Sequence, residues 1–273
     1  MPEVVIDAYF SGTRRAPSAA RLIEYPGESA SLLLALTLLI MASIALAAVT
    51  LGLFAAVLAF SLVQVGIRER RDHARMHLVA RDGPFPQLWG LAKTAAFRLD
   101  VVPVPLYVMS AEVPNAYTTG FWGRHRIVLH SKLVSMLDAE ELAFVIGHEL
   151  GHIRREHVTW LVLASSGSHI GPSLLGQALG LFFNGWSLKG EYTADRAGLL
   201  ACRQFHAAAR ALIKITFWDG PVDVDKVLRA ALEGTERHPL DGLAELFGDH
   251  PFLGNRLRQL QEFDCELREK QVL

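Results

Sequence analysis

The chain has 273 residues, of which 51% are hydrophobic, and its net charge at neutral pH is −1. This charge argues against a nucleic-acid partner, because nucleic-acid-binding surfaces carry an excess of Lys and Arg. The mean hydropathy of +0.25 is high for a soluble protein of this size and indicates a membrane-embedded part. The two cysteines, Cys202 and Cys265, form no spacing motif, so a reducing compartment is favoured over a secreted disulfide framework.

Residues 1–30 mix Pro, Gly, Ser and charged residues, which is typical of a poorly ordered leader. No residue from Ser31 to Ile67 is charged. One helix of that length would be about 55 Å long, whereas the hydrocarbon core of a bilayer is about 30 Å thick. Residues 31–67 are therefore predicted to form a transmembrane helical hairpin, and arginines on both sides of the run predict that both ends lie in the cytoplasm. The alternative is a buried pair of core helices, which rarely lacks charge over so long a run.

Residues 68–273 are predicted to form one compact domain. Segments with helical character lie over 68–80, 87–99 and 131–137. Segments with the alternation of strands lie over 105–109, 116–121 and 126–130. Asp138 and Glu141 have capping-box spacing ahead of a further helix. This order predicts a mostly α fold with a small β-sheet, of the α+β class.

A second uncharged segment runs from Val158 to Leu188 and contains Gly171-Pro172. A single membrane crossing here would separate the residues before it from those after it. We therefore expect residues 158–188 to form an apolar hairpin, which either packs on the domain or dips into the lipid. From Lys189 onward the chain is expected to be helical, with breaks at prolines and glycines.

The helix predicted after Asp138 contains His148-Glu149-Leu-Gly-His152. Residues i and i+4 of a helix share one face, so both imidazoles can bind one metal ion, at about 2.0–2.1 Å if it is zinc. Glu149 would lie beside the metal and could take a proton from the activated water without being a ligand. An ordinary amphipathic helix can carry this pattern by accident. Here the surrounding residues are apolar, and buried polar side chains need partners, so a zinc ion is expected.

Glu191 and Asp195 are also four residues apart in a predicted helix. A zinc site needs at least three protein ligands, and Glu191 is the candidate for the third. Asp195 could then accept a hydrogen bond from a histidine ligand. The alternative is an acidic first turn favoured by the helix dipole, but the upstream pair of histidines favours the metal site.

These features together resemble the membrane-bound zinc endopeptidases of the HtpX and CAAX prenyl-protease type. The resemblance covers residues 65–262 and extends to the idea of an N-terminal anchor. The matching elements are Asn115-Ala116-Tyr117-Thr-Thr-Gly120, Glu140-Glu141-Leu142, His148-Glu149-Leu-Gly-His152, Glu191-x-x-Ala-Asp195, and His250-Pro251 followed by Arg256. The resemblance implies a helical gluzincin-like domain with a short sheet, whose edge strand holds a polypeptide substrate in extended form.

The resemblance also implies roles for single residues. Glu149 would be the general base, and His250 is the candidate donor to the oxyanion, with helix capping before Pro251 as the alternative. Asn115 and Ala116 would bind the substrate backbone beside the edge strand, although Asn115 could instead be a turn residue. Arg256 would either assist at the substrate or hold the cleft together.

Two departures from the family stand out. Only 38 residues separate His152 from Glu191, whereas two full membrane spans would need about 40 residues and a turn. Phe252 stands where the family often has a second proline. The first departure supports a shallow hairpin over a four-span topology.

The implied function is a multi-pass zinc endopeptidase of the cell membrane that acts in the cytoplasm on unfolded or membrane-associated proteins. The alternative is a membrane-anchored binding or regulatory module that does not cleave. Such a module would usually have lost the base or a ligand, and here all four motif residues are present. A structural zinc site is disfavoured, because such sites are typically cages rich in cysteine. No pattern in the sequence indicates an oligomeric state.

Overall fold

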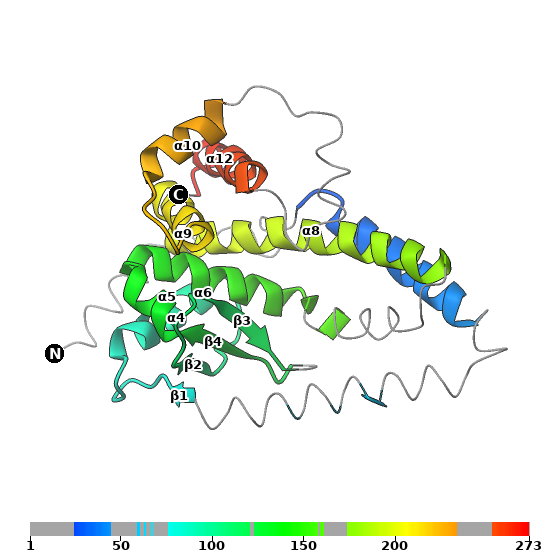
Figure 1. Cartoon of the computed structure of the whole chain (residues 1–273), viewed down its shortest axis with the longest axis horizontal. Helices are drawn as coiled ribbons and strands as arrows, with labels where there is room; N and C mark the ends of the chain where they lie inside the picture. Colours follow the sequence, from blue (N-terminus) through cyan, green and yellow to red (C-terminus); the bar gives the residue numbers. More distant parts are fainter. Residues whose placement is uncertain are drawn as a thin grey trace.

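The structure is a computed structural model that describes residues 25–44, 76–120, 123–157, 174–233 and 253–272, together with a few isolated positions. Its labelled helices are α4 (Pro86–Arg98), α5 (Ser131–Met136), α6 (Ala139–Arg154), α8 (Leu174–Cys202), α9 (Phe205–Thr216), α10 (Val224–Glu233) and α12 (Leu253–Glu269). Its strands are β1 (Met76–Leu78), β2 (Leu106–Met109), β3 (Ala116–Thr119) and β4 (Arg126–His130). The sheet lies on one side of α6, α8 runs across the other side, and α10 and α12 lie beyond α8 (Figure 1). The predicted mostly α fold with a small sheet is confirmed.

The sheet has the strand order β1-β2-β4-β3 and is mixed. β2 and β4 are parallel, whereas β1 and β3 pair antiparallel with their neighbours. The central strand β4 is buried through Ile127, Val128 and Leu129, and Ile127 and Leu129 form part of the main hydrophobic core. β3 is an edge strand of the sheet, so one side of its backbone is not paired with another described strand.

The helix predicted over residues 68–80 is wrong in its described part, because Met76–Leu78 form strand β1. The pairing continues beyond the strand, where the backbone N–H of Val79 donates to the carbonyl of Leu106 at 2.8 Å. The charged pattern of this segment favours a helix locally. The edge of β2 offers backbone hydrogen-bond partners, and this tertiary pairing outweighs the local preference.

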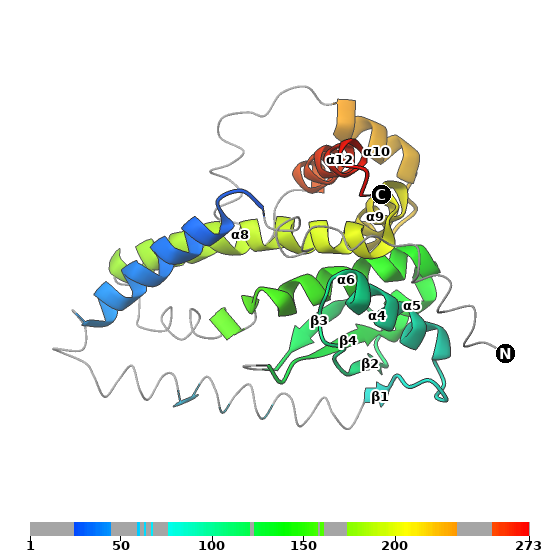
Figure 2. The same ribbon diagram turned by 180° about the vertical axis from the view of Figure 1, so that it is seen from behind.

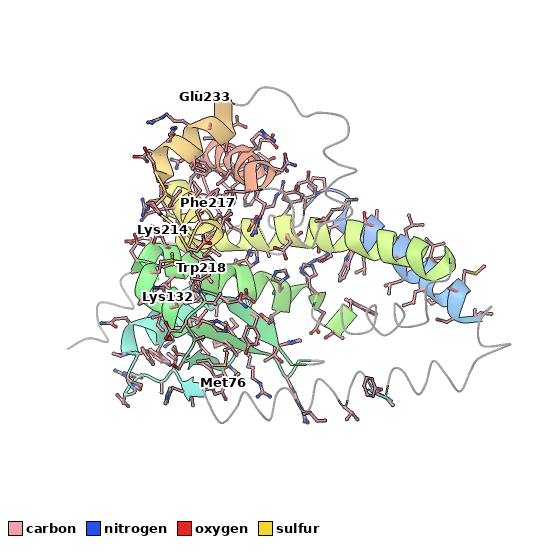
Figure 3. All side chains as sticks on the ribbon, in the orientation of Figure 1. Met76, Lys132, Lys214, Phe217, Trp218 and Glu233 are labelled. Atoms are coloured by element: carbon pink, nitrogen blue, oxygen red, sulfur yellow. The ribbon has the colours of Figure 1, made fainter. Side chains whose placement is uncertain are left out.

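Helix α6 begins at a complete capping box, as predicted. The Asp138 side chain accepts a hydrogen bond from the Glu141 backbone at 2.9 Å, and the Glu141 side chain accepts one from the Asp138 backbone at 3.0 Å. Glu141 is fully buried and also binds Arg210 and Lys214 of α9 at 2.9 and 2.7 Å. Lys214, one of the two cations, is labelled in Figure 3. The cap and the two cations fix the start of α6 and therefore the rotation of the helix that carries the histidines.

Glycines let α6 and α8 approach closely. A Cβ atom added at Gly147 would lie 2.3 Å from the Cβ of Ala201, and one at Gly151 would lie 2.7 Å from the Cβ of Ala197. Neither distance is possible for real atoms, so larger residues would push the helices apart. The small residues on both helices thus bring the motif face of α6 within reach of the acidic residues of α8.

The helix of residues 28–44 lies beside the N-terminal half of α8, as both Figure 1 and Figure 2 show. Ala35 and Trp186 form a small buried cluster between these helices. At its start, the ammonium group of Lys189 donates to the carbonyl of Gly27 at 3.4 Å and to the hydroxyl of Ser31. These contacts attach the start of the N-terminal helix to α8, two residues before Glu191.

The described residues include no helix with both the length and the apolar character that are needed to cross a membrane. The predicted transmembrane hairpin, residues 31–67, falls largely outside the described residues beyond position 44. It stays a prediction. The apolar hairpin expected over 158–188 also stays a prediction, because residues 161–173 lie outside the described part. Residues 174–188 continue without a break into the helix that carries Glu191.

Candidate metal centre

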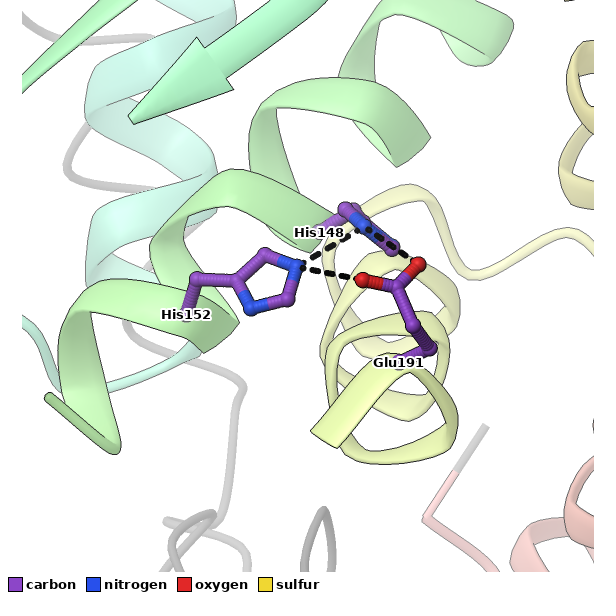
Figure 4. Close-up of side chains that lie close together, drawn as sticks. All are labelled: His148, His152 and Glu191. Carbon is purple, nitrogen blue, oxygen red and sulfur yellow. Dashed lines mark hydrogen bonds and ion pairs between the residues drawn. The ribbon is translucent and has the colours of Figure 1, made fainter. Parts of the chain in front are cut away.

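Three potential metal ligands converge between α6 and α8 (Figure 4). The Nε2 atoms of His148 and His152 lie 3.1 Å apart. The two carboxylate oxygens of Glu191 lie 3.5 Å from His152 Nε2 and 3.9 Å from His148 Nε2. The sequence separates Glu191 from His152 by 38 residues, and the close packing of the two helices brings them together.

The spacing of these atoms suits a tetrahedral metal ion. Zinc bonds of about 2.0–2.1 Å at tetrahedral angles separate neighbouring ligand atoms by about 3.3 Å. The observed distances between 3.1 and 3.9 Å bracket this value. Within the described part of the chain, this is the single group of three or more His, Cys, Asp or Glu residues close enough to hold a metal. The residues therefore fit the metal ion that their donor atoms imply.

His148 is supported by a carboxylate on α8 and a cation on α12. Its Nδ1 lies 3.0 Å from an oxygen of Asp195, the residue that was expected to accept a hydrogen bond from a ligand histidine. The guanidinium of Arg256 donates to both oxygens of Asp195, at 2.6 and 2.7 Å. Burial alone would raise the pKa of Asp195, but Arg256 and His148 outweigh it and hold this pKa below its usual value. Asp195 thus stays ionised and accepts the Nδ1–H of His148. Burial alone would lower the pKa of His148, but Asp195 and Glu191 outweigh it and raise this pKa above its usual value. In the neutral ring, the proton on Nδ1 leaves the lone pair of Nε2 facing the ligand group.

His152 is supported by a longer chain of hydrogen bonds. Its Nδ1 lies 2.8 Å from Nδ1 of His157, and the Nε2 of His157 lies 2.7 Å from a carboxylate oxygen of Glu28. Burial, together with the neighbouring His148, holds the pKa of His152 well below its usual value, so this ring is neutral. No role is predicted from the sequence for His157 or Glu28. The five-residue spacing from His152 to His157 matches no one-face helical pattern, and Glu28 lies in the predicted leader.

Glu149 lies next to the ligand group and contacts the edge strand. Its side chain is buried, and one carboxylate oxygen accepts a hydrogen bond from the Thr118 hydroxyl at 2.7 Å. Burial raises the pKa of Glu149 above its usual value, although His148 and Thr118 oppose the shift. Thr118 was not singled out from the sequence. The signal that could have found it is its place in the segment Asn115–Gly120, which carried the family resemblance.

The other predicted residues lie at different places. Asn115 is exposed directly before β3, and its carbonyl accepts a hydrogen bond from the His130 backbone at 2.9 Å. Ala116 begins β3 and pairs with Leu129. Arg256 contacts Asp195 and comes within 3.7 Å of Glu191, so it lies behind the ligands. His250 lies outside the described residues.

Comparisons with known proteins agree with this geometry. Residues 87–264 match the model of Peptidase family M48. A "Protease HtpX homolog" of Acidiphilium cryptum is 30% identical over 225 residues, which cover 68% of this chain and 77% of the relative. Another "Protease HtpX homolog", of Tropheryma whipplei, is 25% identical over 210 residues, 65% of this chain and 72% of the relative.

A third relative is a larger plant protein. The "Plastoglobule-localized metallopeptidase 48, chloroplastic" of Arabidopsis thaliana is 34% identical over 135 residues. The match covers 47% of this chain and 39% of the relative. The chain therefore spans well under half the length of this relative, and the similarity concerns a shared segment.

Proposed function

The chain belongs to peptidase family M48 and is a metallopeptidase, and from this premise we propose that it is a membrane-anchored zinc endopeptidase. Its substrates would be unfolded or membrane-associated polypeptides, and its site would act on the cytoplasmic side of the cell membrane. The observation that carries the proposal is the meeting of Glu191 from α8 with His148 and His152 from α6.

We propose that His148, His152 and Glu191 hold the zinc ion. When bound, zinc polarises the scissile carbonyl and lowers the pKa of water toward about 7. The neutral state of His152 supports this assignment, because a protonated imidazole has no lone pair to offer. The support that each imidazole receives on its Nδ1 side fits the same role.

Glu149 would be the general base. One of its oxygens accepts the Thr118 hydroxyl, which leaves the other oxygen to take the proton from the attacking water. The raised pKa of the buried carboxyl suits a group that must take a proton and hold it briefly. The same oxygen would then deliver the proton to the leaving amine nitrogen.

The edge strand β3 would bind the substrate. A substrate in extended form can add to the unpaired side of β3 through backbone hydrogen bonds, and Asn115 and Ala116 at its start would contact the substrate backbone. The hydrogen bond between Thr118 of β3 and Glu149 supports this placement, because it joins the proposed binding strand to the proposed base. His250 remains the proposed donor to the oxyanion. The contacts of Arg256 favour its second expected role, in which it holds the cleft together.

The membrane anchor is proposed from the sequence and from one described surface. The uncharged run from Ser31 to Ile67 starts in the helix of residues 28–44. More than half of the surface of several apolar side chains is exposed there: Leu33, Leu34, Ile40, Met41 and Ile44. Lipid would cover such side chains, and the flanking arginines support the cytoplasmic orientation.

The decisive experiment compares the wild-type chain with Glu149→Gln. Both proteins are purified at full length, their zinc content is measured, and cleavage of an unfolded casein-like substrate is followed. We expect the substitution to lower the cleavage rate at least about a hundredfold with the zinc content unchanged. Glu140→Gln, at an exposed position on the same helix, is the matched control and should cleave like the wild type.

Two results would contradict the proposal. Cleavage by Glu149→Gln at the wild-type rate would exclude Glu149 as the base. A wild-type protein that binds zinc but cleaves none of the substrates would favour the binding or regulatory module on the same fold.

A further inference from the structure

Glu28 is a buried carboxylate in a segment that the sequence assigns to the leader. Its residue surface is 1% exposed, and its partners lie between 127 and 165 positions further along the chain. One oxygen lies 2.7 Å from His157 Nε2 and 3.4 Å from the Nε of Arg155, and the other accepts the hydroxyl of Thr193. Burying a carboxylate costs several kcal/mol unless charges and hydrogen bonds compensate, so this placement is a specific interaction of the fold.

His157 is held in one position between Glu28 and His152. It is 2% exposed, and its ring packs edge-on against Trp186, with ring centres 5.4 Å apart. Gly190, directly before Glu191, makes room for it: an added Cβ there would lie 3.1 Å from His157 Cε1. The ring therefore cannot turn freely, and both of its nitrogens are committed to the contacts described above.

The order of donors and acceptors along this chain follows from its ends. A carboxylate can only accept, so His157 donates from Nε2 to Glu28. The Nδ1 of His157 lies 2.8 Å from Nδ1 of His152, and a His157 ring that has its single proton on Nε2 accepts the Nδ1–H of His152 there. As a result, the Nε2 lone pair of His152 faces His148 and Glu191. The opposite order would place an N–H at the ligand group and prevent metal binding.

We propose that Glu28, acting through His157, is a positioning residue of the metal centre, so that residues 25–31 of the N-terminal segment form part of the site that holds the metal. The inference rests on the proposed ligand set, and it extends that set to a segment on the far side of the predicted transmembrane hairpin. It assigns the buried Glu28–His157 pair a role beyond attaching the helix of residues 28–44. Lys189 and Arg155 also attach this segment, through Ser31 and Ser29, but neither contact reaches a ligand histidine.

The test measures the zinc affinity of the purified full-length chain by competition with a chromogenic chelator. Loss of groups that orient metal ligands typically weakens metal affinity about ten- to a hundredfold, and we expect this loss for Glu28→Ala and for His157→Leu. His157→Gln should retain most of the affinity, because its amide can donate to Glu28 and accept from His152 as the imidazole does. Glu156→Gln is the matched control, since Glu156 is the neighbour of His157 but binds His125 and Thr159.

A second measurement separates positioning from simple attachment. The Tm of each variant is recorded without metal and at saturating zinc. A residue that only attaches the segment would lower both values equally and leave the zinc-induced rise in Tm unchanged. A positioning residue reduces that rise, because the stabilisation by a ligand depends on its affinity. We expect the rise to be smaller in Glu28→Ala and His157→Leu than in His157→Gln.

The outcomes distinguish this inference from the proposed function. The inference would be overturned if Glu28→Ala and His157→Leu bound zinc as tightly as the wild type while Glu191→Ala lost zinc. That result would leave the proposed ligand set intact. A His157→Gln variant as weak as His157→Leu would overturn the hydrogen-bond relay. If neither the wild type nor Glu191→Ala binds zinc, the ligand set fails, and this inference fails with it.

Discussion

The two histidines of the motif are supported in different ways. Behind His148, a carboxylate makes direct contact and is itself clamped by a guanidinium. We call His148, Asp195 and Arg256 the direct arm. Behind His152, a second histidine stands between the ring and its carboxylate. We call His152, His157 and Glu28 the relay arm.

The arms also differ in where their parts come from. The direct arm is built from α6, α8 and α12, all of which lie within the catalytic domain that the sequence predicts. The relay arm ends at Glu28, which precedes the predicted transmembrane hairpin. Each arm contacts the Nδ1 side of its histidine and, in the neutral ring, leaves the Nε2 lone pair at the ligand group. Two different constructions thus fulfil one chemical requirement, namely a fixed tautomer at each ligand.

The charges around Asp195 and Glu28 indicate which arm should contribute more to stability and to metal affinity. Asp195 is neutralised by the two hydrogen bonds of the buried Arg256. Glu28 has Arg155 as its cation, at 3.4 Å, and the Arg155 side chain is more exposed than that of Arg256. Removing Asp195 therefore leaves a buried cation without hydrogen bonds to its main carboxylate partner, whereas removing Glu28 leaves a more exposed cation that can turn toward water. We expect the direct arm to dominate both stability and metal affinity.

The first prediction tests this ranking with Asp195→Ala. Zinc affinity should fall about a hundredfold, which is the upper end of the loss that follows when a group that orients a metal ligand is removed. The free energy of unfolding of the metal-free protein should fall by about 3–5 kcal/mol, because the buried Arg256 loses its two hydrogen bonds to a carboxylate and keeps the longer contact to Glu191 at 3.7 Å. Chelator competition measures the affinity, and urea unfolding measures the stability.

The control for Asp195→Ala is Glu266→Ala on the same C-terminal helix as Arg256. Glu266 pairs with Lys270 at 3.6 Å on the surface, and such pairs contribute about 0–1 kcal/mol. This variant should bind zinc like the wild type. If Asp195→Ala weakened zinc binding less than Glu28→Ala does, the ranking of the two arms would be reversed.

The second prediction asks whether each arm acts as a unit, by means of double-mutant cycles on zinc affinity. Combining Glu28→Ala with His157→Leu should cost little more than either change alone, since both break the same relay. The coupling energy should fall in the range of about 0.5–3 kcal/mol that contacting residues show. Combining Glu28→Ala with Asp195→Ala should give losses that add in free energy. Additive losses within the relay arm would show that Glu28 and His157 act independently.

The features predicted best from the sequence are those that depend on a regular spacing or on residues close together in the chain. The capping box of α6 depends on two residues three positions apart, and strand β4 was predicted at its observed bounds, Arg126–His130. The failure at β1 has the opposite cause: its three residues carry no strand pattern of their own, and pairing with β2 decides their structure.

The same distinction holds for the metal centre. His148 and His152 on one helix, and Glu191 and Asp195 on the other, were singled out as candidates because a spacing of four residues marks one helical face. Glu28 and His157 are 129 positions apart, and no period links them. Their contact arises from the packing of the N-terminal helix on α8, which a single sequence does not reveal.

The last prediction concerns Thr118, which contacts the proposed base and neither of the two arms. Thr118→Val keeps the shape of the side chain and the strand preference of the position but removes the hydroxyl that donates to Glu149 at 2.7 Å. A hydrogen bond to a charged group contributes about 1.5–3 kcal/mol, so kcat should fall by about ten- to a hundredfold. Zinc affinity should not change, because both ligand histidines keep their hydrogen-bond partners.

Thr119→Val is the matched control, since successive residues of a strand point to opposite faces and Thr119 points away from Glu149. A Thr118→Val variant with normal kcat but weakened zinc binding would show that the edge strand supports the metal ligands, and that a third arm must be added to the two compared here.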